Sequence, residues 1–146
     1  MRVLLLGVIA LVAAAVSTTA FGGAESAKDQ FAFPVFDSCN NEIVNVSGTF
    51  HTVVKTTDNG DGTSNVTLVL NAKGTGIGAE SGTEYEFIET IHQEITIGGP
   101  FVTGAFTDKL RLISHGADQN LIMDTTFSLD ADGTITSVTV TNCRGA

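Results

Sequence analysis

Apolar and polar residues alternate along six long runs of this 146-residue chain, and this alternation restricts the fold more than any other feature. A period of two places successive side chains on opposite faces, which is typical of a β-strand with one buried face. Beyond the N-terminal apolar segment, no stretch keeps the 3.6-residue period of a helix. The six predicted strands cover residues 42–56, 63–72, 83–97, 101–114, 120–130 and 134–143.

Turn chemistry and composition both support strands. Clusters of Gly, Asp and Asn separate the runs, among them 58–62 and 130–133. Residues 25–146 contain 18 Thr, 10 Val and 9 Ile, so 37 of 122 residues are β-branched and favour a pleated sheet. Pro34 within residues 31–36 predicts a short edge strand or a plug. Residues 73–82 indicate a glycine-rich loop.

Cys39 and Cys143 are the only cysteines; Cys39 precedes the first predicted strand, and Cys143 is the last residue of the sixth. In a closed antiparallel meander of six strands, the end of the last strand lies beside the start of the first. The sequence therefore predicts a Cys39–Cys143 disulfide at the seam of an all-β, antiparallel up-and-down β-barrel of about six to eight strands. Two free buried thiols are the alternative to the disulfide. A β-sandwich would show the same alternation and is the alternative fold.

The N-terminal segment predicts export. Arg2 precedes an apolar run from Val3 to Val16, and small residues follow it, which is the layout of a secretory signal peptide. We expect residues 1–24 to be this signal, with cleavage after Ala20 or Ala24, and residues 25–146 to form a single β-barrel domain. The mature protein would be extracellular or periplasmic, without a transmembrane segment.

The charge of the chain argues against nucleic acid as a partner. The whole chain has 16 acidic and 7 basic residues, a formal net charge of −9. Residues 25–146 keep all 16 acidic residues and 6 of the basic ones, so the mature chain would carry −10. A phosphate backbone needs a basic patch, and the few basic residues are scattered.

Two carboxylates fall on the predicted inward face. Glu89 and Asp108 interrupt the apolar faces of the runs 83–97 and 101–114. If Ile97 lies opposite Val102, Glu89 faces Leu110 and Asp108 faces Ile91, which makes the two carboxylates diagonal neighbours. Burying an unpaired carboxylate is costly, so such a pair usually marks a partner, a raised pKa or a wet pocket.

Other polar residues join this predicted cluster. If Leu112 lies opposite Leu121, Asp108 faces Thr125; Gln93 and Tyr85 share the inward face of the run 83–97. The five residues Tyr85, Glu89, Gln93, Asp108 and Thr125 are therefore our candidate ligand-binding site, the polar end of an otherwise apolar pocket. The alternative is a β-bulge near Gly104 or Thr107 that turns one carboxylate out toward Lys109 or Arg111.

The remaining motifs predict no metal site and no cofactor. His51, His92 and His115 lack the spacing of a metal site and fall on outward faces or in a loop. The acidic stretch 128–135 resembles half of an EF-hand loop, but strands flank it and it favours a hairpin turn. The run 74–79 partly matches a dinucleotide fingerprint, yet no helix follows it. Asn45 and Asn65 fit the glycosylation sequon.

The chain resembles a group of small, uncharacterised secreted bacterial β-proteins. The residues that carry this resemblance are Cys39, Glu42, Gly48, His51, Asp61-Gly62, Gly76, Gly78, Ser81-Gly82, Tyr85 and Asn142-Cys143. More distantly it is similar in architecture to lipocalin-like barrels. The second resemblance implies a small apolar ligand held in the barrel mouth.

From the sequence we expect a secreted, non-enzymatic binding or surface-interaction module with a small apolar molecule as the candidate ligand. A structural cell-surface or extracellular protein with a filled barrel is one alternative. A small barrel enzyme that uses Glu89 and Asp108 as acid and base is the other.

Overall fold

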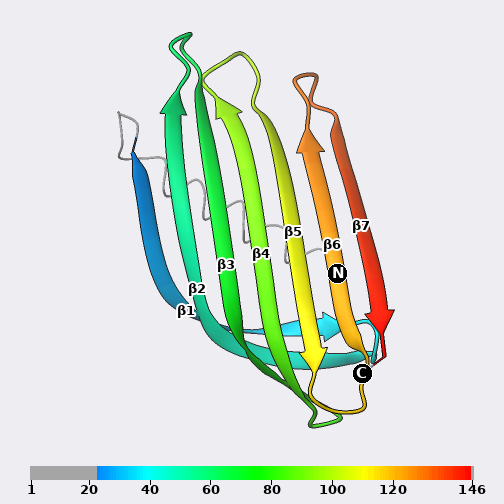
Figure 1. The fold of residues 1–146 in the computed structure, drawn as a ribbon. Coiled ribbons are helices and arrows are strands. Elements are labelled where there is room, and N and C mark those ends of the chain that lie inside the picture. The colour runs from blue at the N-terminus through cyan, green and yellow to red at the C-terminus, as the bar shows by residue number, and fades with distance from the viewer. Residues whose placement is uncertain (1–22, 146) are drawn as a thin grey trace.

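In a computed structural model, residues 23–145 are described, and they form seven β-strands and no helix (Figure 1). The predicted signal peptide, residues 1–24, lies almost entirely outside the described residues. No helix of the described residues is long and apolar enough to cross a membrane. The strands are β1 (Ala24–Asp37), β2 (Glu42–Asp58), β3 (Ser64–Gly78), β4 (Glu84–Ile97), β5 (Thr103–Ser114), β6 (Asn120–Leu129) and β7 (Ile135–Arg144).

The strands form one antiparallel up-and-down sheet in the order β1 to β7. All six predicted runs are strands, so the all-β, antiparallel meander is confirmed. The edge strand predicted at 31–36 is confirmed, although it is part of a longer strand of 14 residues. The loop predicted at 73–82 was wrong for its first part, because this glycine-rich segment continues β3 as far as Gly78.

The added first strand changes how the sheet can close. With seven strands in an up-and-down sheet, β1 and β7 run in the same direction, whereas six would have left antiparallel edges. Within the described residues β1 pairs only with β2 and β7 only with β6. The sheet is open, so the predicted closed barrel is not confirmed.

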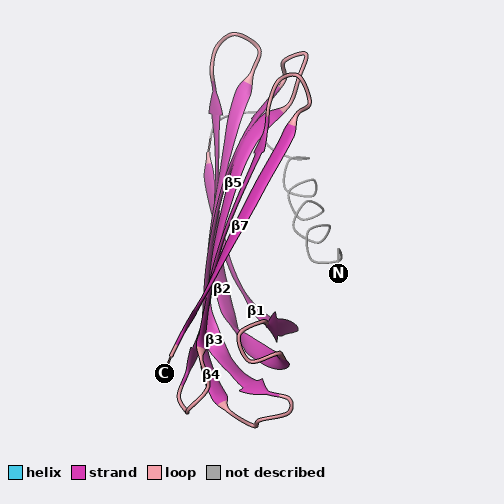
Figure 2. Ribbon diagram, turned by 90° about the vertical axis from the view of Figure 1, so that its right-hand side faces the viewer, coloured by secondary structure: helices cyan, strands magenta, loops and turns pink. Residues whose placement is uncertain are grey.

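The sheet is strongly curled at one end. The ends of β1 and β2 that meet at their shared turn fold over one face of the sheet and reach across toward β7 (Figures 1 and 2). We call the covered face the concave face and the opposite one the convex face. The concave face carries Phe87 and the convex face carries His92, because successive residues of β4 alternate.

A pair of glycines lets the backbones of β2 and β3 approach each other closely at the curl. Gly48 of β2 lies opposite Gly74 of β3. A Cβ added to Gly48 would collide with the backbone of Lys73 and Gly74, and one added to Gly74 would collide with the carbonyl of Ser47. Only residues without a Cβ let the two strands come this near, so glycine is required here by contact rather than by backbone conformation.

The hydrophobic core fills the space under the curled hairpin. Phe31 and Phe33 of β1 pack against Phe87 of β4, with ring centroids 5.3 and 5.8 Å from that of Phe87. These contacts form although two strands, β2 and β3, lie between β1 and β4 in the sheet. The core therefore joins the hairpin to the middle of the sheet. Its buried members are Val35, Val44, Val46, Ala72, Tyr85, Phe87, Leu110, Leu112 and Leu121.

Two long-range links hold the curled end to the far side of the sheet. The Cys39–Cys143 disulfide, predicted from the sequence, is present and joins residues 104 positions apart. Beside it, the Asn40 side chain donates to the Gln119 carbonyl at 2.8 Å and accepts from the Gln119 backbone N–H at 3.0 Å. The β1–β2 turn is thus tied both to β7 and to the β5–β6 loop.

Replacing Gly74 with alanine should destabilise the protein by on the order of 2 kcal/mol, because the methyl group would press against the Ser47 carbonyl and force β2 and β3 apart. Urea unfolding followed by circular dichroism measures the change. Gly99→Ala is the matched control, since an added Cβ there meets only ordinary contacts of 3.6 Å or more. Equal stabilities of the two variants would contradict the role assigned to the glycine pair.

Candidate functional site

Glu89 and Asp108 both lie on the concave face, in the register predicted from the sequence. Glu89 is opposite Leu110, and Asp108 is opposite Ile91 and Thr125. The pairing of β4, β5 and β6 runs through these positions without a bulge, so neither carboxylate is turned outward. The two carboxylates are diagonal neighbours on one face.

Two polar atoms of this group are buried without a hydrogen-bond partner among the described residues. They are Oδ1 of Asp108 and Oε1 of Gln93. Gln93 lies opposite Phe106, two residues along β4 from Ile91, so it flanks Asp108 on the side away from Glu89. Thr125 faces Asp108, but its hydroxyl makes its hydrogen bond with Thr139 at 3.1 Å. Buried polar groups are almost always paired, so two adjacent unpaired acceptors are unusual.

Burial makes both carboxyls weak acids. Desolvation, with a smaller contribution from the Asp108 charge, raises the pKa of Glu89 from 4.5 to about 7. Desolvation, together with the charge of Asp124, raises the pKa of Asp108 from 3.8 to about 6. Each carboxylate therefore changes its charge near neutral pH. No cation lies within salt-bridge distance of either carboxylate in the described part of the chain.

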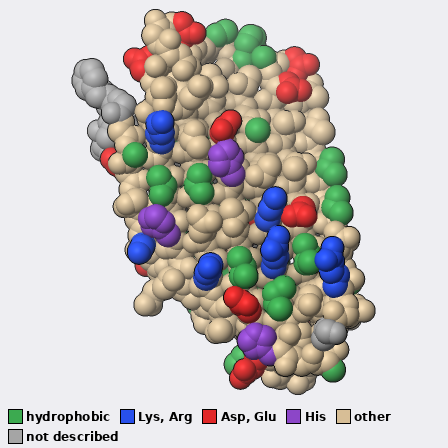
Figure 3. All heavy atoms as spheres, viewed as in Figure 1, with side chains coloured by type: hydrophobic (Ala, Val, Ile, Leu, Met, Phe, Trp, Pro, Cys, Tyr) green, Lys and Arg blue, Asp and Glu red, His purple; other side chains and the backbone are tan. Residues whose placement is uncertain are grey.

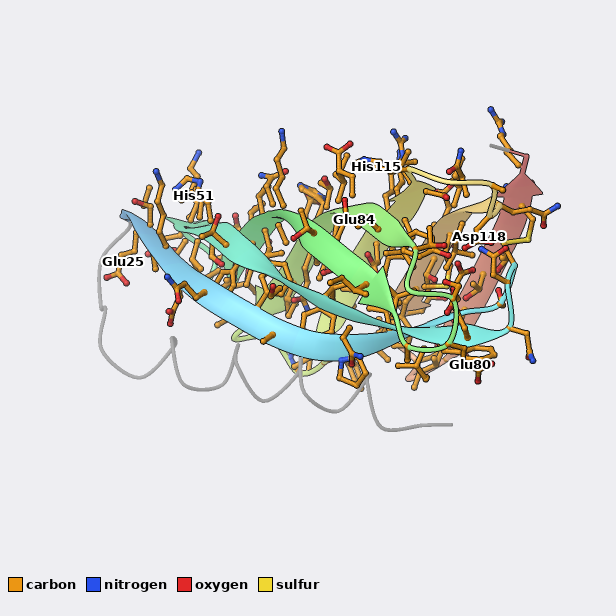
Figure 4. The ribbon with its side chains drawn as sticks, turned by 90° about the horizontal axis from the view of Figure 1, so that it is seen from below. Glu25, His51, Glu80, Glu84, His115 and Asp118 are labelled. Atoms are coloured by element: carbon orange, nitrogen blue, oxygen red, sulfur yellow. A yellow bond between two sulfur atoms is a disulfide. The ribbon has the colours of Figure 1, made fainter. Side chains whose placement is uncertain are left out.

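The structure places Tyr85 in a different cluster. Its side chain is fully buried, and its hydroxyl lies 3.0 Å from Oε1 of Glu42 and 3.3 Å from Oδ2 of Asp118. This cluster lies at the curled end, where Figure 4 looks into the fold and labels Asp118 together with Glu80 and Glu84 from neighbouring segments. Of the five predicted site residues, the sheet thus brings Glu89, Gln93, Asp108 and Thr125 together and leaves Tyr85 apart.

The cluster around Tyr85 is internally satisfied. Glu42 accepts hydrogen bonds from the Ser81 hydroxyl at 2.9 Å and from the backbone N–H groups of Glu80 and Ser81. Desolvation raises the pKa of Glu42, but the hydrogen bonds from Ser81, Tyr85 and Glu80 outweigh it and hold that pKa below 4.5. Desolvation and the neighbouring Glu42 charge raise the pKa of Tyr85 well above 10, so it stays a hydrogen-bond donor.

Sequence reasoning missed this second cluster. Glu42 has the same parity as Val44 and Val46, so the alternation already placed it on the inward face. Asp37 likewise shares the parity of Val35, and it is fully buried, accepting a hydrogen bond from the Asn40 side chain at 2.8 Å. Asp118 lies in a loop, where no periodicity could have indicated its position.

The other candidate motifs are scattered over the convex face and the turns. His51, His92 and His115 lie on separate elements, and the view of Figure 3 shows the three imidazoles apart among basic and acidic side chains. His92 lies 3.7 Å from Glu94. Backbone hydrogen bonds between residues 130 and 134 confirm a hairpin turn at the EF-hand-like stretch. No group of three or more metal-ligating side chains occurs among the described residues.

Comparisons with protein-family models, with curated proteins and with solved structures gave no match. The candidate site therefore has to be judged on its own geometry.

The stability of the protein should decrease as the pH rises from about 4 to about 7. A carboxyl whose pKa is raised on folding binds its proton more tightly in the folded state, so its stabilising effect is complete below the unfolded pKa and is lost as the pH rises through the folded pKa. For Glu89, with a pKa of about 7, and Asp108, with about 6, the full shifts correspond to about 3 kcal/mol each. Solvent screening of these partly exposed groups reduces the loss to on the order of 2 kcal/mol each.

Glu89→Gln and Asp108→Asn should therefore flatten this pH dependence and raise stability at pH 8, as measured by urea unfolding from pH 4 to 8. Glu86→Gln changes an exposed residue of the same strand on the convex face and should leave the profile unaltered. A wild-type stability that is constant or rises over this range would refute the burial of the two carboxyls.

Tyr85→Phe should destabilise the protein by about 1–3 kcal/mol, because Glu42 loses the Tyr85 hydroxyl as a hydrogen-bond donor at a buried position. Chemical unfolding at pH 7 measures it. Ligand binding through Asp108 should be unaffected in this variant, which separates the two clusters experimentally; a loss of binding at unchanged stability would contradict that separation.

Proposed function

We propose that the protein is an exported binding module that holds a small, mainly apolar molecule against the concave face. In this proposal Asp108 and Gln93 accept hydrogen bonds from a donor group on that molecule. The single observation that carries it is the pair of buried, unpartnered acceptor atoms, Asp108 Oδ1 and Gln93 Oε1. A bound donor would supply the partner that each of them otherwise lacks.

The surroundings of these atoms favour an apolar ligand body. The two residues nearest to Asp108 and Gln93 in the ladder are Ile91 and Phe106, and Leu110 follows along β5. Ile91 and Leu110 are both buried. An apolar wall with a few convergent polar groups is the usual composition of a small-molecule site.

The charge of the pair favours a cationic donor such as an ammonium group. Two carboxylates lie as diagonal neighbours without a counterion, and each would gain a partner from a positive charge. Ion pairing favours the ionised form, so a bound cation should lower both pKa values and release protons. Binding should then strengthen with pH through the range in which Glu89 and Asp108 ionise.

Export belongs to the proposal. The Cys39–Cys143 disulfide is of the kind that persists in oxidising compartments, and the N-terminal sequence has the layout of a signal peptide. An exported binding module would meet its ligand outside the cytoplasm. No ladder joins β1 to β7 among the described residues, so the strands do not close around the concave face.

Binding of three probes with the same twelve-carbon chain, dodecylamine, dodecanol and dodecanoate, tests the proposal. Calorimetric titration below the micellar concentration should give the highest affinity for the amine and the lowest for the carboxylate. Dodecylamine should bind more tightly at pH 8 than at pH 5. Asp108→Asn should weaken amine binding about fivefold or more, since a charge-assisted hydrogen bond is about 1 kcal/mol stronger than a neutral one.

Glu86→Gln, on the convex face of β4, is the control and should bind the amine like the wild type. Gln93→Leu should weaken dodecanol as well as the amine, because it removes an acceptor and not a charge. Equal affinities for amine and carboxylate, or an Asp108→Asn variant that binds like the wild type, would overturn the proposal.

A further inference from the structure

The outer edge formed by β7 has no device that prevents pairing with another strand. All ten residues of β7 are exposed. Between Gly133 and Cys143 the chain has neither a charged residue nor a proline, and it alternates Thr or Ser with Ile and Val over most of this length. Long, uncharged edge strands are templates for a further strand, and soluble proteins normally interrupt them.

The opposite edge is interrupted in the usual way. β1 carries Glu25, Lys28 and Asp29 in its first half and Pro34 in its second half. Charged residues and proline at an edge disfavour strand addition. β1 thus has charged residues and a proline along its length, whereas β7 has neither before its last residue, so β7 is the edge that favours pairing.

The hairpin hydrogen bonds show which backbone groups of β7 are free for pairing. The backbone N–H of Asp130 donates to the carbonyl of Thr134 at 3.0 Å, so 130 and 134 form a hydrogen-bonded pair at the start of the β6–β7 ladder. In an antiparallel ladder such pairs recur at every second residue. The even-numbered residues of β7 therefore face β6, and the outward N–H and carbonyl groups belong to Ile135, Ser137, Thr139, Thr141 and Cys143.

We propose that β7 pairs with β7 of a second copy of this chain, antiparallel and two-fold symmetric, with Thr139 opposite Thr139 of the second copy. In this register the odd-numbered residues form the hydrogen-bonded pairs. Val138 lies opposite Val140 of the second copy on the convex face, and the two-fold axis repeats the contact. These two valines are 53% and 50% exposed in the single chain, and the pairing gives both an apolar neighbour.

Charge complementarity supports the same register. Arg144, the only charged residue of β7, lies opposite Thr134 of the second copy. There it is next to the acidic turn of the second copy, which contains Asp130 and Asp132. The symmetry brings one such arginine to each turn. A chain with an excess of acidic residues thus meets its own copy with opposite charges at both ends of the pairing strand.

Sedimentation velocity of the mature protein over a wide concentration range tests the dimer. The wild type should approach twice the monomer mass at high concentration. Val138→Lys should raise the dimer dissociation constant at least about tenfold, because it places a charge in the centre of the pairing edge. Ile77→Lys is the matched control: Ile77 is 55% exposed on the convex face of β3, away from the edge, and the variant should dimerise like the wild type.

Disulfide trapping tests the register and does not depend on the stability of the lysine variant. A mixture of Val138→Cys and Val140→Cys proteins should form a disulfide between the two variants under mild oxidation, because opposite residues in this type of pair have Cα atoms about 4.5 Å apart. Val138→Cys alone should not cross-link to itself, since its copy lies diagonally, about 7 Å away or more. Peptide mapping under non-reducing conditions identifies the bond.

Three results would overturn the proposal. These are a protein that stays monomeric at every concentration, a mixture without the mixed disulfide, and a Val138→Cys protein that links to itself as efficiently as the mixture. Ligand binding on the concave face is measured separately, so failure of the dimer leaves that function unaffected.

Discussion

The backbones of β2 and β3 touch at Gly48 and Gly74, and the curled end of the sheet can form because neither residue has a Cβ. The curl turns a single sheet into a structure with an inside. Without the curl Phe31 and Phe33 could not reach Phe87, because the strands β2 and β3 lie between β1 and β4 in the sheet. The apolar residues of a flat sheet would then lack a second layer to bury them.

The curled end is secured by polar contacts as well as by apolar packing. The disulfide and Asn40 tie the β1–β2 turn to β7 and to the β5–β6 loop. Glu42, Tyr85 and Ser81 tie the start of β2 to β4 and to the β3–β4 turn. These buried polar groups have hydrogen-bond partners, which is what makes their burial tolerable. The result is one rigidly braced end on a sheet whose other end stays open.

Outside the braced end, two sets of hydrogen-bonding groups have no partner among the described residues. Asp108 and Gln93 lie farther along the strands than the Tyr85 cluster, on the same face, and their acceptor atoms have no partner in the described chain. The edge of β7 is open because no ladder joins it to β1. The polar groups of the curled end are paired with one another, whereas the middle of the concave face and the edge of β7 have hydrogen-bonding groups without partners.

The sequence by itself determined six of the seven strands, the registers around Glu89 and Asp108, and the cysteine pairing. These follow from local properties: alternation assigns each side chain to a face, and short turns set which residues lie opposite one another. Glu42 was also assignable by parity. Only the tertiary structure decided that β1 is a full strand, that the sheet stays open, and that Tyr85 joins Glu42 rather than Glu89. Edge strands with charges and a proline lack a clear pattern, and one added strand reverses the relative direction of the two edges. Curvature depends on contacts between residues distant in sequence, such as Gly48 with Gly74, which no periodicity records.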